Sequence, residues 1–154
     1  MDPEIFRDLI IRPTLGALNM GGRAAEDLLL GTALVESGLR HLRQIRGPAL
    51  GLYQCEPATY ADILEYVRAR PDILARLRPL IAGSGLPDAS QIVWNLKFAT
   101  AICRLHYWRV PAPIPADRAG QAAYWKRYYN TVHGRGTVAK YLACARFQTE
   151  GGPQ

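Results

Sequence analysis

The feature that most constrains the fold is a series of segments with helical periodicity, each followed by glycine or proline. Apolar residues recur at three- and four-residue spacing within these segments, as on one face of an α-helix. Gly38 after Ser37 is typical of a helix end, and Pro57 is typical of a helix start. The sequence therefore predicts a mainly α fold, while a short hairpin over 50–54 stays open as an alternative. The expected helices cover residues 2–18 with a bend at Pro13, 23–37, 57–68, 72–81, 88–107, 118–130 and 137–145, with an irregular loop over 39–55.

The length and composition predict one globular domain over residues 1–154. The chain has 154 residues, of which 49% are hydrophobic and 21% charged, close to the averages of globular domains. Residues 149–154 are expected to form a frayed tail. The longest apolar run, Leu28 to Val35, falls short of the roughly 18 residues of a membrane span, so no transmembrane helix is expected. The opening Met1-Asp2-Pro3-Glu4 differs from a secretory signal, and we expect synthesis in the cytoplasm.

Charge and cysteine content exclude some classes of site. The formal net charge of +6 suits an anionic partner, but the arginines are dispersed, which is typical of solvated helix faces. Nucleic acid is therefore the partner that the sequence favours least. Cys55, Cys103 and Cys144 are odd in number and widely spaced, so neither a disulfide framework nor a zinc site is predicted. No metal or cofactor is expected.

Glu36 differs from the other carboxylates, most of which lie at predicted helix starts or on polar faces. Val35 and Leu39 continue an apolar pattern around it, which places Glu36 at the edge of the core in the last turn of a helix. Partial burial there would raise the pKa of its carboxyl group, as a general acid near neutral pH requires. The alternative is a structural glutamate paired with a nearby arginine.

Five short segments follow one another in a recognisable order. Glu36-Ser37 is followed by Gly47-Pro-Ala-Leu-Gly-Leu-Tyr-Gln54 and by Glu56-Pro-Ala-Thr59, then by Asn95 with Ala99, and finally by Tyr129-Asn130 with Gly134. This order resembles the catalytic core of soluble lytic transglycosylases and goose-type lysozymes. That family has Glu-Ser at a helix end, then Gly-Ala-x-Gly-Leu-Met-Gln, then Met-Pro-x-Thr, an Asn-x-x-x-Gly helix and a Tyr-Asn-Ala-Gly-Pro-Gly region. Tyr53 stands where the family has methionine, Pro48 is inserted, and the Tyr-Asn region lacks its immediate Gly-Pro.

The resemblance implies a single lysozyme-like helical domain with an active-site groove that cleaves peptidoglycan without water. Glu36 would be the one catalytic acid and base, giving 1,6-anhydro-muramoyl ends. Glu56 is a nearby carboxylate for which a helix-start role is the simpler interpretation. Gln54 and Tyr129 also have structural alternatives, as a loop tie and as a core aromatic residue. The substrate-binding residues implied are Ser37, Gly51, Leu52, Tyr53, Gln54, Asn95, Tyr129 and Asn130.

A cell-wall substrate and a cytoplasmic start require a route out of the cell. The resemblance, together with the Gly120 to Thr131 segment, suggests a phage virion-associated member that meets other virion proteins and acts in the periplasm or cell wall. The alternative is a virion structural protein that keeps the lysozyme-like fold with weak or no activity.

Overall fold

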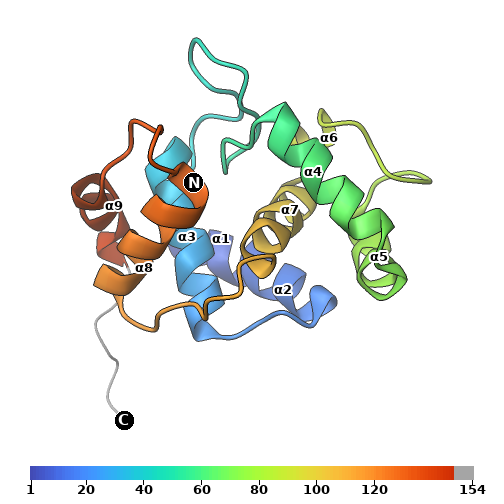
Figure 1. Cartoon of the computed structure of the whole chain (residues 1–154), viewed down its shortest axis with the longest axis horizontal. Helices are drawn as coiled ribbons and strands as arrows, with labels where there is room; N and C mark the ends of the chain where they lie inside the picture. The colour runs from blue at the N-terminus through green and yellow to red at the C-terminus, as the bar shows by residue number, and fades with distance from the viewer. Residues whose placement is uncertain (148–154) are drawn as a thin grey trace.

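The computed structural model describes residues 1–147 and is mainly helical, which confirms the predicted fold class (Figure 1). The central helix α7 (Leu96–Trp108) contacts α2, α3, α4 and α6. Its buried residues, from Phe98 to Tyr107, lie in one hydrophobic core shared with these helices. In the described part of the chain, no helix is long and apolar enough to cross a bilayer. The tail expected over 149–154 lies outside the described residues.

The N-terminal segment is helical throughout, with a change of helix type in the place of the predicted bend. The elements are α1 (Pro3–Phe6), the π-helix η1 (Arg7–Ile11) and α2 (Arg12–Leu18). Pro13 lies in the first turn of α2, directly after η1, and has no N–H to donate to the preceding turn. The N–H of Arg12 instead donates to the carbonyl of Arg7, which closes the wider π turn just before the proline.

Helix α3 (Arg23–Ser37) has the predicted bounds, and it carries Glu36 in its last turn. Gly38 ends it in the left-handed conformation, with φ 61°. A Cβ at Gly31 would collide with the Tyr141 side chain of α9, so α3 and α9 pack at close range there. This packing fixes the end of α3 relative to the C-terminal helices.

The loop after α3 is irregular, as expected, and leads into α4 (Pro57–Arg68). Strand pairing in residues 1–147 is limited to isolated bridges of Leu50 with Arg43 and with Cys55. Residues 50–54 therefore form a single tight turn in place of the hairpin considered as an alternative. Beyond α4 follow α5 (Pro71–Leu77) and the short 3₁₀ helix η2 (Arg78–Leu80), in the region predicted as one helix over 72–81.

The long helix predicted over 88–107 is interrupted, which corrects the sequence-based expectation. It begins as α6 (Gln91–Trp94), and α7 follows after Asn95, whose ψ of 93° is not helical. The Asn95 side chain accepts a hydrogen bond from the N–H of Phe98 and donates to the carbonyl of Leu80. An asparagine that can cap the following helix and also tie it to another segment competes with the helical backbone, so the chain breaks there.

The C-terminal part comprises α8 (Arg118–Trp125), the π-helix η3 (Lys126–Asn130), α9 (Val138–Cys144) and the 3₁₀ turn η4 (Ala145–Phe147). The helix expected over 118–130 is therefore continuous but changes type at Lys126. Thr137 caps α9 by accepting a hydrogen bond from the N–H of Lys140. The segment between η3 and α9 returns towards the end of α3, where the pocket opens.

Candidate active site

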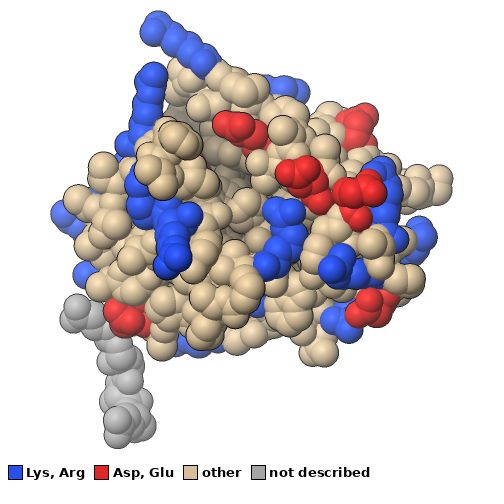
Figure 2. Space-filling view, in the orientation of Figure 1, with Lys and Arg blue, Asp and Glu red and all other residues tan. Residues whose placement is uncertain are grey.

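A pocket of about 860 Å³ opens between the end of α3, the loop after it, the start of α4 and the segment from η3 to α9. Figure 2 shows the hollow in the upper part of this face, with Lys and Arg side chains above and to its left and an acidic side chain to its right. Segments about 90 residues apart in the sequence thus share one cavity. Its size suits a sugar-sized ligand.

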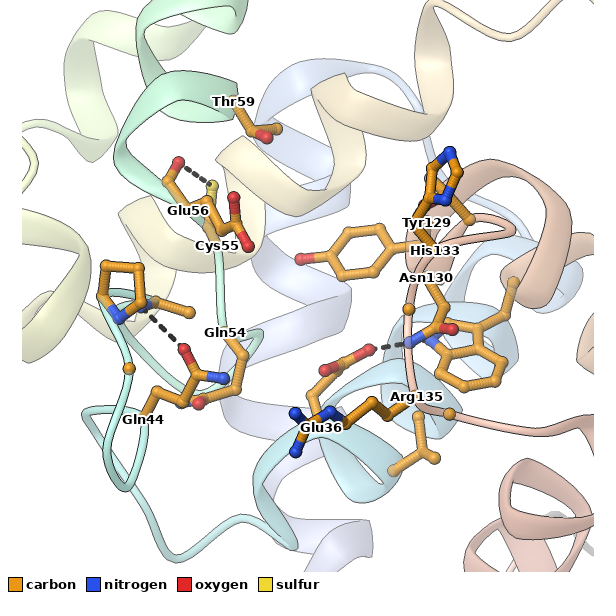
Figure 3. A pocket seen from close by; sticks show the side chains of 18 of the residues that line it. Glu36, Gln44, Gln54, Cys55, Glu56, Thr59, Tyr129, Asn130, His133 and Arg135 are labelled. Carbon is orange, nitrogen blue, oxygen red and sulfur yellow. Dashed lines mark hydrogen bonds between the residues drawn. The ribbon is translucent and has the colours of Figure 1, made fainter.

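Glu36 lies on the floor of this pocket, half-buried at the end of α3 (Figure 3). Its carboxylate accepts a hydrogen bond of 3.0 Å from the Nε1–H of Trp125. Burial raises the pKa of Glu36 to about 7, and the smaller effects of the Trp125 hydrogen bond and the Lys140 charge act in the opposite direction. Within residues 1–147 Glu36 forms no ion pair, unlike the structural glutamate considered as an alternative. This carboxyl group can therefore both donate and accept a proton near neutral pH.

Trp125 holds the Glu36 carboxylate in place, a role that the sequence analysis did not assign. The indole ring is 1% exposed and packs against Tyr141, with 5.5 Å between the ring centroids. A ring fixed in this way presents its N–H in one direction only. The available signal was spacing: Trp125 stands four residues before Tyr129 in a predicted helix, so both side chains fall on one face.

Gln54 lines the same pocket, on the wall opposite Asn130 (Figure 3). The residue has a positive φ of 49°, and its Nε2 donates to the carbonyl of Gly51 at 2.9 Å. Gln54 therefore ties its own loop, through Gly51 and His41, whereas the structural alternative expected a tie to the helix that begins at Pro57. Its amide oxygen makes no hydrogen bond with any described residue, so that oxygen stays available to a ligand.

Tyr129 and Asn130 also line the pocket, whereas Tyr128 does not. The Tyr129 hydroxyl donates to the carbonyl of Tyr53 at 2.7 Å, and its ring stacks on Tyr107 with 5.3 Å between the centroids. Burial raises the pKa of Tyr129 well above its ordinary value, so this hydroxyl stays neutral. The Asn130 Oδ1 accepts from Lys126 Nζ at 2.7 Å, which leaves the Asn130 amide nitrogen to face a ligand.

Five of the residues implied by the resemblance do not line the pocket. The Ser37 hydroxyl is buried and donates to the carbonyl of Ala33. Leu52 and Tyr53 are each 2% exposed, and the Tyr53 hydroxyl pairs with Thr100 at 3.0 Å. Tyr53 thus fills a core position, where the family's methionine would also be an apolar side chain.

Gly51 and Asn95, the other two, have structural positions as well. Gly51 has φ 75°, and a Cβ there would collide with the backbone carbonyl of Ile92, so glycine is needed for the loop to approach α6. Asn95 caps α7 and bridges to Leu80.

The start of α4 supplies the remaining wall, with Cys55, Glu56 and Thr59. Glu56 is exposed at the N-cap position just before α4, makes no side-chain capping hydrogen bond and directs its carboxylate into the pocket (Figure 3). Burial raises the pKa of the Cys55 thiol to about 12, so it stays a neutral thiol, which is a poor nucleophile. In the part of the chain described, no cluster of His, Cys, Asp or Glu is arranged to hold a metal ion.

Comparison with known proteins assigns no family: no protein-family model matches the chain, and no curated protein or solved structure shows significant similarity to it.

Proposed function

We propose that this protein is a lytic transglycosylase that cleaves the glycan strands of peptidoglycan, with Glu36 as its single acid and base. The observation that carries the proposal is the state of the Glu36 carboxyl group. It lies half-buried in a sugar-sized pocket, is held by Trp125, has a pKa of about 7 and forms no ion pair within the described residues. The order of motifs around it supports the same assignment.

The reaction uses Glu36 twice. In the first step the protonated carboxyl donates to the glycosidic oxygen, and the bond between that oxygen and the muramoyl C1 breaks through an oxocarbenium-like state. The substrate's own N-acetyl group supports the positive charge at C1. In the second step the Glu36 carboxylate takes the proton of the sugar's C6 hydroxyl, and the C1–O6 bond forms. The carboxyl group is then protonated again, and no water is consumed.

The other pocket residues would position the sugar. The amide oxygen of Gln54 accepts from a hydroxyl or N-acetyl N–H, and the Asn130 amide donates to an oxygen. Tyr129 joins the two walls through its hydrogen bond to Tyr53. A tethered C6 hydroxyl next to C1 has a large effective concentration relative to solvent water, which favours the anhydro product.

Glu56 offers a competing chemistry, because a second carboxylate in the pocket could activate water for hydrolysis. It is exposed immediately before the first turn of α4. The reaction product separates the two possibilities, since hydrolysis leaves a reducing end and transglycosylation leaves an anhydro end lighter by one water.

We place this activity in a phage particle, with the chain acting on the wall in the periplasm alongside other virion proteins. The motif order supports the assignment. Exposed apolar side chains, Trp94 at 60% and Trp108 at 43%, offer contact area for such partners.

The test is digestion of purified peptidoglycan, followed by mass spectrometry of the muropeptides. We expect 1,6-anhydro ends from the wild-type chain and a loss of at least about 10²- to 10⁴-fold in rate for Glu36→Gln, since the amide keeps the shape but transfers no proton. Glu65→Gln, an exposed carboxylate of α4 outside the pocket, is the matched control and should retain full activity.

Two outcomes would contradict the proposal. Reducing ends only, together with loss of activity in Glu56→Gln, would identify a two-carboxylate hydrolase. A folded wild-type chain that cleaves nothing would favour the structural virion protein.

A further inference from the structure

The rim of the pocket is cationic on two sides. Arg46 lies in the loop after α3, Arg135 in the segment after η3, and Lys140 in the first turn of α9; all three line the pocket and are exposed. Among the described residues none of these three side chains forms an ion pair. In the part of the chain that the structure describes, Glu36 and Glu56 are the only carboxylates that line the pocket.

Arg46 and Arg135 both lie on loops that hydrogen bonds hold in place. The loop around Arg46 is closed by the Gln44 N–H to the carbonyl of Ala49, at 2.9 Å, and by the Ala49 N–H to Gln44 Oε1, at 3.1 Å. Arg46 itself has φ 58°, so it occupies a tight turn rather than a loose connection. The backbone at this rim is therefore fixed before any ligand arrives.

The segment that carries Arg135 is held in place through its neighbours Gly134 and Gly136. Lys126 Nζ donates to the carbonyl of Gly134 at 3.0 Å, and a Cβ at Gly136 would collide with Trp125, so the segment lies directly against the residues that hold Glu36. Figure 3 shows the Arg135 side chain extended across the pocket, towards the wall that carries Gln44 and Gln54. A glycan in the pocket would therefore pass within reach of cations from two loops.

We propose that Arg46 and Arg135, with Lys140, bind carboxylate groups carried by the glycan, so that the pocket selects anionic glycan strands over neutral ones. This inference rests on the proposed function, because it takes the ligand to be a glycan. Guanidinium groups bind carboxylates by paired, charge-assisted hydrogen bonds, and an unpaired cation has no internal partner to give up on binding. The carboxylates have two sources: the lactyl group on the sugar itself, and the peptides attached to it.

The experiment measures binding by the full chain carrying Glu36→Gln, so that no ligand is consumed. The ligands are a neutral chitin hexasaccharide, peptide-free peptidoglycan strands with the lactyl carboxylate, and strands that retain their peptides. We expect both anionic strands to bind about 10-fold more tightly than the chitin oligomer in 50 mM salt, and the difference to shrink in 500 mM salt. Tight binding of peptide-free strands identifies the lactyl group as the source, and tight binding that requires peptides identifies the stems.

A second comparison, between variants, measures what the two rim arginines contribute to binding. Arg46→Gln with Arg135→Gln should weaken binding of anionic strands by about 3- to 10-fold per arginine and leave chitin binding unchanged. Arg43→Gln is the matched control, since Arg43 is exposed in the same loop but does not line the pocket. Lys140 is left intact because its charge also acts on Glu36.

Equal binding of neutral and anionic glycans would overturn the inference, as would equally tight binding of a short single-stranded DNA, which would indicate a general polyanion surface. The same experiments distinguish a failure of this inference from a failure of the proposed function. Selective, arginine-dependent binding without cleavage by the wild-type chain would keep the carboxylate site and remove the transglycosylase, whereas cleavage without selectivity would do the reverse.

Discussion

At the C-terminal end of α3, Glu36 experiences two opposing effects on one carboxyl group. Burial disfavours the charged form, while the indole N–H of Trp125 and the charge of Lys140 favour it. Burial is the larger effect, so the pKa rises to about 7 instead of falling. A carboxyl group balanced in this way suits proton transfer in both directions, and it weakens the folded state whenever it is ionised.

The first prediction concerns stability against pH. The unfolded carboxyl has a pKa near 4.5 and the folded one about 7, so the folded state binds the proton more tightly. Stability is then lost as the pH rises from about 4.5 through 7, by roughly 3 kcal/mol. Glu36→Gln removes this titration. Urea unfolding should show the variant gaining stability relative to wild type across that range and no further above pH 8.

A constant difference between the two proteins from pH 4.5 to 8 would contradict this prediction. It would show that the Glu36 carboxyl is solvated and has an ordinary pKa. Glu65→Gln serves again as the control, because Glu65 is exposed.

At the scale of elements, the turn over 51–54 depends on one glycine that approaches α6. Gly51 has φ 75°, and a Cβ there would meet the carbonyl of Ile92. Gly83 has a similar φ of 90°, but a Cβ there would meet nothing within 4 Å. Comparing substitutions at Gly51 and Gly83 therefore separates the cost of the left-handed backbone from the cost of a steric collision.

We predict that Gly83→Ala costs about 1–2 kcal/mol of unfolding free energy, from the left-handed conformation alone. Gly51→Ala should cost about 1–3 kcal/mol more, because the added methyl group must displace backbone. Chemical denaturation of both variants measures the difference. Equal losses would show that the loop can move away from α6 without penalty, and the wall of the pocket would then not be fixed by this contact.

Local signals explain which elements the sequence predicted. The end of α3 at Gly38 and the start of α4 at Pro57 follow from one residue's backbone preferences, so they were predicted correctly. The break at Asn95 depends on the carbonyl of Leu80, which lies 15 residues earlier, and no local pattern shows it. The helix type of 126–130 was missed for a different reason: the spacing of apolar residues hardly differs between an α-helix and one π turn.

The residues of the candidate site also divide into those that the sequence placed correctly and those that it did not. Glu36, Gln54, Tyr129 and Asn130 do line one pocket, as the motif order implied. Ser37, Leu52 and Tyr53 are neighbours of these residues in sequence, but a helix or a turn points adjacent side chains in different directions, here into the core. The spacing of Trp125 to Tyr129 could have placed Trp125 on the same face, but its hydrogen bond to Glu36, 89 residues away, depends on tertiary packing that a single sequence does not display.

Across the whole molecule, the pocket joins walls from two distant parts of the chain. The loop with Gln54 and the helix η3 with Asn130 meet at one hydrogen bond, from the Tyr129 hydroxyl to the carbonyl of Tyr53, across 76 residues. Local backbone bonds, such as the Gln54 N–H to the carbonyl of Gly51, hold only one wall. The relative position of the walls therefore depends on Tyr129 more than on either wall's own structure.

Tyr129→Phe tests this dependence, since it keeps the stacking on Tyr107 and removes the hydroxyl alone. Losing the bond leaves the Tyr53 carbonyl without its partner and should cost about 1–3 kcal/mol locally. Hydrogen exchange at the amides of Gln54 and Cys55 should then become about 5- to 100-fold faster, because fewer contacts oppose local opening.

Tyr128→Phe is the matched control in the same π-helix, since the Tyr128 hydroxyl makes no hydrogen bond within residues 1–147. Equal exchange in the two variants would mean that the walls keep their positions without this bond, and that Tyr129 acts only as a ring in the core. A faster exchange confined to Tyr129→Phe would instead show that one hydroxyl couples η3 to the loop that carries Gln54. The proposed function depends on this coupling, because Glu36 and Gln54 would contact one sugar only while the two walls keep their spacing.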